Sequence, residues 1–191
     1  MKDIRIKAAG FGGQGVMMFG KFLAYAAVEA NKNALWFPSY GPETRGGTAN
    51  CSVIIADGQI NSPVFGVIDN LAVFNGPSLE KFEKYMDKDG FILYNADLIK
   101  KEDIKFSGKS YGVEINTIAT KLGLPQAANM VMIGAYLEIT NLFDDKTAES
   151  VVKHILGERK AKFVPINMQA IAEGRKAIRF INNKNKYLGY T

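Results

Sequence analysis

Three glycines near the start of the chain have the spacing of a phosphate-binding turn. Gly10, Gly12 and Gly15 satisfy the pattern G-x-G-x-x-G, with Gly13 and Gln14 between them. Glycine lets the backbone turn tightly and approach a ligand without an intervening Cβ. A helix that begins at such a turn presents unpaired N–H groups and a partial positive charge to an anion. The spacing predicts an anion site or, as the alternative, a turn that only allows close strand–helix packing.

A second loop contains residue types that suit anion binding. Residues 36–51 read W-F-P-S-Y-G-P-E-T-R-G-G-T-A-N-C, which is dense in glycine and proline. Arg45 is a candidate bidentate clamp for a phosphate or a carboxylate. The alternative is that Arg45 pairs with Glu43 as ordinary loop charges do. The other candidate contacts in this loop are Ser39, Tyr40, Gly41, Gly46 and Gly47.

The sequence argues against a dinucleotide as the ligand. A dinucleotide site uses an Asp or Glu about 20 residues beyond the glycine turn to bind the ribose hydroxyls. Residues 35–39 read L-W-F-P-S and contain no acid, and Glu43 lies further on in the loop. A stand-alone nicotinamide- or flavin-dependent oxidoreductase is therefore kept only as an alternative function.

The elements that must position these residues alternate between strands and helices. Strands are expected at 4–9, 34–37, 48–56, 71–75, 91–95 and 110–113, with Pro38 ending the second. Helices are expected at 16–30, from 77 onward, and at 116–122, 127–142, 145–156 and 167–182. Asp57-Gly58 is a hairpin signal leading to residues 59–60. This order predicts an α/β, Rossmann-like three-layer sandwich with a mixed, mostly parallel sheet and an antiparallel hairpin.

This fold would bring the two loops together. Both follow strands that end at the carboxyl edge of the sheet, where open α/β sheets bind ligands. The length of 191 residues suits one domain, predicted at 1–182, with residues 183–191 as a mobile tail.

Cysteine and histidine usage excludes several chemistries. The chain has one cysteine, Cys51, and one histidine, His154. Iron–sulfur clusters take about four cysteine ligands, and structural zinc sites about four Cys or His ligands, so this chain builds neither. No metal site and no catalytic residue are predicted. A lone cysteine also forms no internal disulfide, which suits the cytoplasm.

The composition limits the classes of partner expected for the chain. The hydrophobic fraction of 47% and charged fraction of 23% are those of a globular domain, and no signal peptide is expected ahead of the first strand. The net charge of +5 comes from scattered lysines and arginines, without a basic stripe for nucleic acid. No apolar run approaches the roughly 20 residues that span a bilayer. Neither a nucleic acid nor a membrane is expected as a partner.

Four further residues have ordinary structural roles in this interpretation. His154 lies near a helix C-terminus, where a cationic side chain is favourable. Cys51 is expected to be a small buried hydrophobe on a strand. Asp144 is expected to be a helix cap or part of a turn, and Asn129 is a candidate helix N-cap.

Three sequence blocks carry a family resemblance. They are G-F-G-G-Q-G-V at 10–16, P-S-Y-G-P-E-T-R-G-G-T-A-N at 38–50 and N-M-V at 129–131. Together they resemble the gamma subunit of 2-oxoacid:ferredoxin oxidoreductases over residues 3–180. The resemblance is strongest to the 2-oxoglutarate branch, with branched-chain and pyruvate enzymes behind it. Thr44 stands where relatives usually have Met, which leaves fine specificity open.

The resemblance implies a subunit that is catalytically silent alone. Such complexes convert a 2-oxoacid, here 2-oxoglutarate, to acyl-CoA and reduce ferredoxin. Thiamine diphosphate and the iron–sulfur clusters lie on alpha, beta and delta partners, and the gamma chain helps to position coenzyme A. The expected partners are these subunits or, for the isolated chain, a second copy; a purely structural assembly role is the alternative. The residues expected to contact the cofactor are Gly10, Gly12, Gly13, Gln14, Gly15, Ser39, Tyr40, Gly41, Arg45, Gly46, Gly47 and Asn129.

Overall fold

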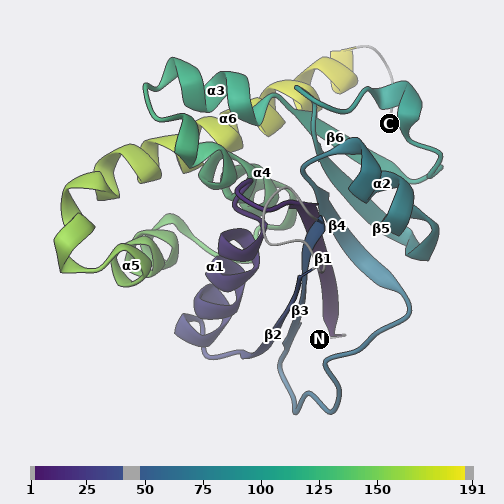
Figure 1. Ribbon diagram of the computed structural model, residues 1–191, viewed down its shortest axis with the longest axis horizontal. Coiled ribbons are helices and arrows are strands. Elements are labelled where there is room, and N and C mark those ends of the chain that lie inside the picture. The colour runs from purple at the N-terminus through teal and green to yellow at the C-terminus, as the bar shows by residue number, and fades with distance from the viewer. Residues whose placement is uncertain (1–2, 41–47, 188–191) are drawn as a thin grey trace.

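A mixed six-stranded sheet forms the centre of the protein (Figure 1). The structure, a computed structural model, describes residues 3–40 and 48–187, without the side chains of 180 and 182–187. The strands are β1 (Ile4–Phe11), β2 (Asn33–Tyr40), β3 (Thr48–Ala56), β4 (Ile68–Val73), β5 (Met86–Asn95) and β6 (Lys109–Val113). Their spatial order is β2-β3-β1-β4-β5-β6. The three ladders from β1 to β6 are parallel, whereas β3 runs antiparallel to both β1 and β2.

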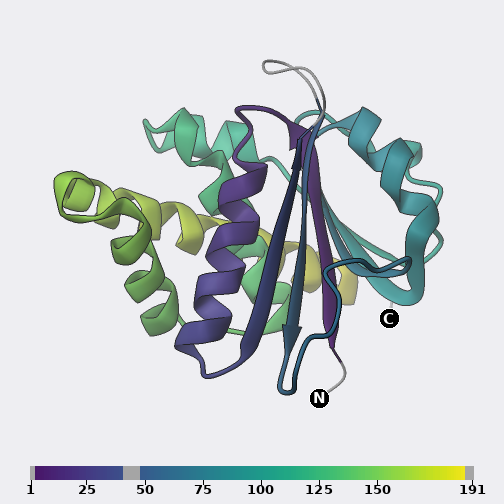
Figure 2. The same cartoon turned by 60° about the horizontal axis from the view of Figure 1, so that its bottom comes forward.

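Helices cover both faces of this sheet (Figure 2). The α-helices are α1 (Val16–Glu29), α2 (Gly76–Phe82), α3 (Ile115–Lys121), α4 (Ala128–Thr140), α5 (Asp145–Leu156) and α6 (Val164–Tyr187). Short 3-10 helices lie at Glu83–Tyr85, Lys101–Asp103, Pro125–Ala127 and Glu158–Phe163. Helix α2 lies alone on one face, and the other α-helices lie on the opposite face. The predicted α/β three-layer class is therefore confirmed.

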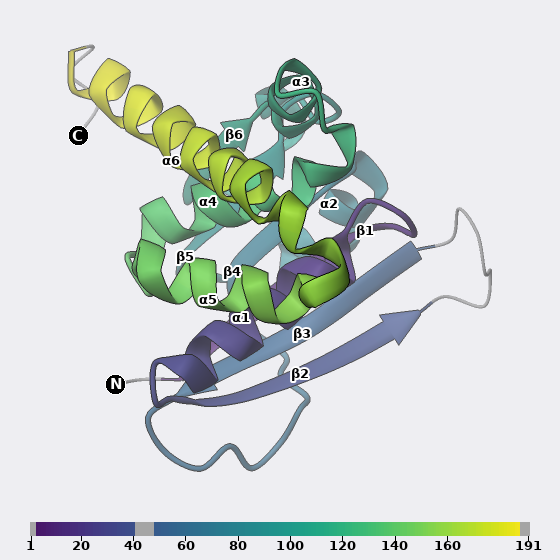
Figure 3. The ribbon, with the colours of Figure 1, turned by 90° about the vertical axis from the view of Figure 1, so that its left-hand side faces the viewer.

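Two apolar cores hold the layers together. The larger core joins the sheet to the five-helix layer and includes Phe19, Phe74 and Tyr136. In that layer α1 packs on β2 and β3, while α4 and α6 approach β5 and β6 (Figure 3). The smaller core lies under α2 and includes Leu71 and Leu79. The sheet is thus packed on both of its faces.

Helices α4 and α6 cross at very close range. A Cβ on Gly134 would overlap the backbone carbonyl of Ile171, and a Cβ on Gly174 would overlap that of Val131. Glycine at both positions allows the two backbones to touch, which places α4 firmly against α6. Because α4 begins beside the glycine turn, this contact also fixes the position of the site.

Two predictions about the β2–β3 region were wrong. Residues 59–60 do not form a hairpin strand with β3, because β1 and β2 already occupy both of its edges. Pro38 does not end the second strand, which continues to Tyr40. Since β2 is the outermost strand, a residue without an N–H is tolerated there. None of the helices in the described part of the chain has the length and apolarity needed to cross a membrane.

Candidate functional site at the glycine turn

The glycine turn joins β1 to α1 at the carboxyl edge of the sheet, as predicted. Gly13 and Gly15 adopt left-handed backbone conformations, with φ of 95° and 82°. A Cβ on Gly10 would lie 2.8 Å from Phe74 Cβ and from Val16 Cγ2. Gly10 therefore serves strand–helix packing, which is the structural alternative offered by the sequence. Gly12 and Gly13 instead have no atom within 4 Å of a Cβ and face open space.

The side chain of Gln14 forms hydrogen bonds that stabilise the glycine turn. Its Oε1 accepts hydrogen bonds from Phe11 N at 2.7 Å and Asn75 Nδ2 at 3.0 Å. Its Nε2 donates to Phe74 O at 3.4 Å. Asn75 Oδ1 in turn accepts from Ser78 N and caps α2. Gln14 thus ties the first strand, the fourth strand and α2 together, while its predicted contact with a cofactor stays a prediction.

The amino terminus of α1 is arranged to attract an anion. Its N-cap is Gly15, which provides no side-chain hydrogen bond, and its first turn contains no acidic residue. The first N–H groups of a helix lack intrahelical partners, and the helix dipole makes this end positive. With open space over Gly12 and Gly13, an anionic group can approach these N–H groups directly.

Asn129 of α4 lies directly against this turn. A Cβ on Gly15 would come 2.6 Å from Asn129 Cβ, and the Asn129 residue is only 7% exposed. The suggestion that Asn129 is an N-cap was wrong: a 3-10 turn precedes α4, Ala127 is its N-cap, and Asn129 lies within the first turn. The amino ends of α1 and α4 therefore meet at one point.

A cavity of about 370 Å³ opens beside the turn. Its volume is in the range of small-molecule sites. The polar residues that line it are Gly13, Gln14, Asn95, Asn116, Thr120 and Gln126. Phe74, Pro125 and Ala128 complete the wall. No charged side chain lines this cavity among the described residues, so its chemistry is that of neutral amides and a hydroxyl.

The second loop starts and ends at the same edge of the sheet. Thr48, the first residue of β3, pairs with Phe11, the last residue of β1, and Tyr40 at the end of β2 pairs with Ala49. Ser39 and Tyr40 are exposed there, Tyr40 by 70%. The ends of the loop therefore lie beside the glycine turn, as expected. The predicted contacts Gly41, Arg45, Gly46 and Gly47, like Glu43 and Thr44, lie outside the described residues.

Comparison with known proteins identifies the family. The model of the pyruvate ferredoxin/flavodoxin oxidoreductase family matches residues 5–177. The chain belongs to this family. The gamma subunit of a keto/oxoacid ferredoxin oxidoreductase from Geobacter sulfurreducens has a similar fold, with a TM-score of 0.77 and 30% identity. The match covers 92% of this chain and 98% of that subunit, so this family member is of the gamma type.

Two relatives differ in length and in their named substrates. The chain is 37% identical to the ketoisovalerate oxidoreductase subunit VorA of Methanothermobacter marburgensis over 91% of its own length. It spans only 36% of the length of VorA. It is 32% identical to the 2-oxoglutarate synthase subunit KorC of Methanocaldococcus jannaschii, covering 79% of this chain and 81% of KorC. Family membership is thus clear, but these sequence identities do not decide to which substrate branch of the family the chain belongs.

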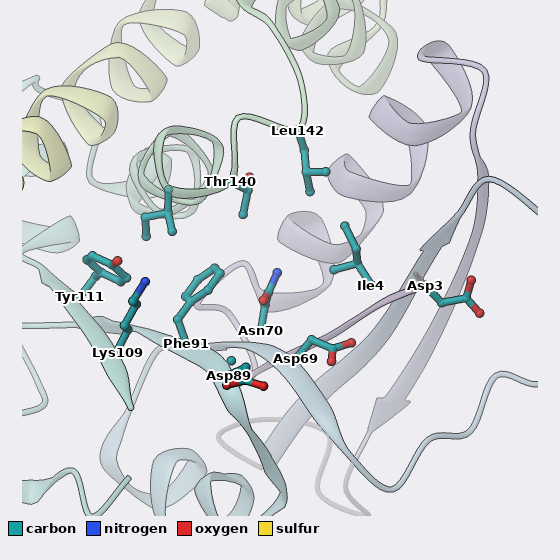
Figure 4. A pocket seen from close by; sticks show the side chains of 12 residues that line it. Asp3, Ile4, Asp69, Asn70, Asp89, Phe91, Lys109, Tyr111, Thr140 and Leu142 are labelled. Carbon is teal, nitrogen blue, oxygen red and sulfur yellow. The ribbon is translucent and has the colours of Figure 1, made fainter. Parts of the chain in front are cut away.

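A second, separate cavity of about 410 Å³ lies at the opposite edge of the sheet in this family member (Figure 4). It is lined by the starts of the parallel strands and the end of α4, including Asp69, Phe91 and Thr140. Asp69 forms an ion pair with Arg5, whose Nη2 lies 2.7 Å from Asp69 Oδ1. None of the predicted site residues that the structure describes lines this cavity, so it is distinct from the cavity at the glycine turn.

Cys51 and His154 do not line the cavity beside the glycine turn. Cys51 is completely buried, as predicted, and burial raises the pKa of its thiol to about 11. His154 of α5 stacks edge-on against Tyr25 of α1. Asp144 caps α5 by accepting a hydrogen bond from Thr147 N, which confirms that prediction. Among the described residues, no three His, Cys, Asp or Glu side chains gather as a metal site would require.

Sequence reasoning missed the amides around the glycine turn. Asn75 follows the buried strand β4, and Asn95 is the last residue of the buried strand β5. Parallel strands place such positions at the carboxyl edge of the sheet. That signal was readable in the sequence. Asn116 lies in the first turn of α3 and Gln126 in the 3-10 helix that follows α3, and only the packing of α3 against α4 brings them to the cavity.

Proposed function

We propose that this chain is the gamma subunit of a cytoplasmic 2-oxoacid:ferredoxin oxidoreductase complex. The complex would oxidatively decarboxylate a 2-oxoacid to its acyl-CoA and pass the electrons to ferredoxin. The observation that carries the proposal is the family match over residues 5–177, together with near-complete coverage of a gamma subunit. Thiamine diphosphate and iron–sulfur clusters would belong to the alpha, beta and delta partners. With a single buried cysteine, this chain offers no cluster ligands of its own.

The proposed contact with coenzyme A rests on the glycine turn. Coenzyme A carries phosphates, and the uncapped amino end of α1 beside open Gly12 and Gly13 favours a phosphate group. Arg45 is proposed as a further anion contact, because Thr48, which follows its loop, pairs with Phe11 at the glycine turn. The absence of an acid at residues 35–39 supports coenzyme A over a dinucleotide.

The proposed substrate is 2-oxoglutarate, supported by the sequence blocks and by the similarity to KorC. A second candidate is the branched 2-oxoacid ketoisovalerate, because VorA has the higher identity. Substrate contacts are expected mainly on the partner subunits, so the site described above does not distinguish between the two substrates.

Purification of the tagged full chain from its native source tests the assembly. The expected result is a complex that contains thiamine diphosphate and the visible absorption of iron–sulfur clusters. It should reduce a viologen dye with a 2-oxoacid only when coenzyme A is present. Comparison of kcat/KM for 2-oxoglutarate, ketoisovalerate and pyruvate would choose the substrate. A monomer that turns over a 2-oxoacid without partners would overturn the proposal.

Two further measurements separate the rival functions. In the complex, Arg45→Ala should raise the KM for coenzyme A, whereas Arg159→Ala, which removes an exposed surface charge, should not. An unchanged KM in Arg45→Ala would favour a purely structural assembly subunit. Calorimetric titration of the full chain with NAD(H), NADP(H), FAD and coenzyme A tests the oxidoreductase alternative. Tight dinucleotide binding would favour that alternative.

A further inference from the structure

We propose that the half of the sheet formed by β2 and β3 docks another subunit of the complex, which brings a carboxylate to Lys7. This inference rests on the proposed assembly with partner subunits and goes beyond it by naming the face that a partner covers. The docking surface is defined by three residues that the partner would bury, Lys7, Phe37 and Val64. The partner is identified by its chemistry, which is an acidic side chain within an apolar patch.

One face of β2 and β3 has no α-helix over it in the described part of the chain. Helix α2, which lies on this side of the sheet, packs on β1 and β4 (Figure 2). Helix α1 packs on β2 and β3 from the opposite side. The register places Phe37, Ser52 and Lys7 side by side on the α2 face, because Ser52 of β3 pairs with both of the others. A strip of sheet without a helix therefore runs from the outermost strand to Lys7.

Lys7 is a half-buried cation that has no carboxylate partner within the described ranges. Its Nζ donates to Ser52 Oγ at 2.9 Å and to Asn50 Oδ1 at 3.1 Å. Both acceptors are neutral and buried, so they fix the ammonium over the sheet without balancing its charge. An ammonium has three N–H donors, and the third remains available to a further acceptor.

The surroundings of Lys7 favour an anion as that acceptor. The rings of Phe65 and Phe82 have their centroids 5.9 Å and 5.2 Å from its Nζ, and they keep water from the ammonium. Burial, followed by the charge of nearby Lys81, holds the pKa of Lys7 below its usual value. A cation that loses water without gaining a counter-ion is costly, and a carboxylate bound at this point would offset that cost.

Exposed apolar side chains accompany this cation. Phe37 is 49% exposed and lies two strand spacings from Lys7, about 10 Å. Val64 is 74% exposed and directly precedes Phe65, whose ring lies against Lys7. A small anion would neutralise Lys7 and leave Phe37 and Val64 in water, whereas a protein surface covers all three. The docking surface therefore suits a protein chain.

The charges favour a different subunit over a second copy of this chain. A symmetric dimer places the same patch on both copies, which would bring one Lys7 toward the other. The docking surface contains no carboxylate that could separate the two cations, and the chain as a whole has a net charge of +5. The carboxylate must therefore come from another kind of chain.

Chemical modification of the purified complex tests the contact directly. A water-soluble carbodiimide joins an amine to a carboxylate where the two touch, and mass spectrometry of the joined peptides names both residues. The expected link runs from Lys7 to an Asp or Glu of another subunit. Acylation of amines gives a second measurement: Lys7 should react about fivefold more slowly in the complex than in the isolated chain, because a docked surface excludes water. Lys153, an exposed lysine of α5 in the opposite layer, is the internal reference.

Lys7→Met tests the charge, because it removes the ammonium and keeps the length of the side chain. Loss of one buried ion pair should raise the apparent Kd of the chain for the rest of the complex by roughly 30-fold or more, as measured by mass photometry on dilution. Lys21→Met is the matched control, since Lys21 also lies over an aromatic ring but on α1. Circular dichroism of the isolated chains separates a loss of docking from a loss of fold.

Phe37→Asp and Phe37→Lys keep the test decisive if Lys7→Met does not fold. Both remove the same apolar contact from an exposed position, and they differ in the sign of the new charge. A partner that brings a carboxylate should bind Phe37→Lys more tightly than Phe37→Asp, by roughly threefold at low salt. Equal affinities, or the reverse order, would contradict an acidic partner.

The outcomes separate this inference from the proposed function. If an active complex forms but Lys7 links to no other subunit and is acylated equally in the complex and in the isolated chain, the docking surface is wrong while the proposed function stands. A link from Lys7 to a second copy of this chain makes the surface a self-interface and overturns the inference. If the chain forms no complex with thiamine- and cluster-bearing subunits, the proposed function and the docking surface fail together.

Discussion

Gly15 at the start of α1 and Asn129 in the first turn of α4 are packed so closely that no side chain fits between them. A Cβ on Gly15 would lie 2.6 Å from that of Asn129. Each helix therefore fixes where the other begins. The anion-attracting end of α1 and the wall of the cavity are consequently one rigid unit, and changes at this contact should affect both.

Gly15→Ala is expected to lower the free energy of unfolding by about 2 kcal/mol or more, because a left-handed backbone and a steric overlap both oppose the new Cβ. Gly15 has φ of 82°. Urea unfolding followed by circular dichroism measures the change. Gly12→Ala is the control: its Cβ would meet no atom within 4 Å, so a change within about 0.5 kcal/mol is expected. Equal losses in both variants would contradict the packing argument.

Gln14→Leu should destabilise the turn by about 1–3 kcal/mol, because it leaves the Phe11 N–H and the Asn75 amide without their acceptor. Amide hydrogen exchange at Phe11 should accelerate in the variant. In the complex, the KM for coenzyme A should rise while kcat stays close to the native value, since the turn is displaced and not the chemistry. Gln59→Leu, an exposed change, should alter none of these quantities.

Gly174→Ala should lower the free energy of unfolding despite its better helix propensity. Alanine gains about 1 kcal/mol over glycine inside a helix, whereas the overlap with the Val131 carbonyl costs about 1–3 kcal/mol because backbone atoms cannot move aside. The overlap is expected to prevail. Thermal and urea unfolding measure the net effect, with Gly58→Ala as a control in open space. A stabilised Gly174→Ala variant would show that α4 and α6 can separate without penalty.

Cys51 should make stability depend on alkaline pH. Burial raises the pKa of its thiol from 9.0 to about 11, so in that interval the unfolded chain loses a proton that the folded protein keeps. The contribution of Cys51 to stability is therefore complete below pH 9 and is lost as pH rises toward 11. The native protein should lose up to about 1.4 kcal/mol per pH unit relative to Cys51→Ala. Parallel pH profiles for the two proteins would contradict this.

The same residue should resist thiol reagents in the folded state. Cys51 is fully buried, and the thiolate is the reactive form. Labelling with a disulfide reagent at pH 8 should occur only as fast as the protein unfolds, and urea should accelerate it. Rapid labelling without denaturant would contradict the burial of Cys51.

The local order of strand, turn and helix was readable from the sequence, but long-range pairing was not. The first strand, the glycine turn and α1 follow from residues that are neighbours in the chain. The insertion of β3 between β1 and β2 depends on the pairing of β3 with β1, which joins residues far apart in the chain, such as Ile4 and Ile55. Local turn chemistry at Asp57-Gly58 therefore suggested a hairpin that the sheet has no edge to accommodate.

The candidate site was predictable to a similar degree. The open glycines and the placement of the second loop followed from the order of the elements. The hydrogen bonds that hold the Gln14 side chain inside the turn could not be predicted, because its partner Asn75 is 61 residues away. The amides of Asn116 and Gln126 are brought to the cavity by the packing of α3 and α4, which no short pattern specifies.

The outermost position of β2 has a consequence for how the protein behaves in a crowded solution. An exposed strand edge is a template on which another copy of the chain can add a strand, and such addition leads to aggregation. Pro38 lacks the N–H that a full row of new hydrogen bonds would need, and its ring disfavours continuous pairing. Replacing Pro38 with valine should therefore lower the solubility of the chain more than the stability of its fold.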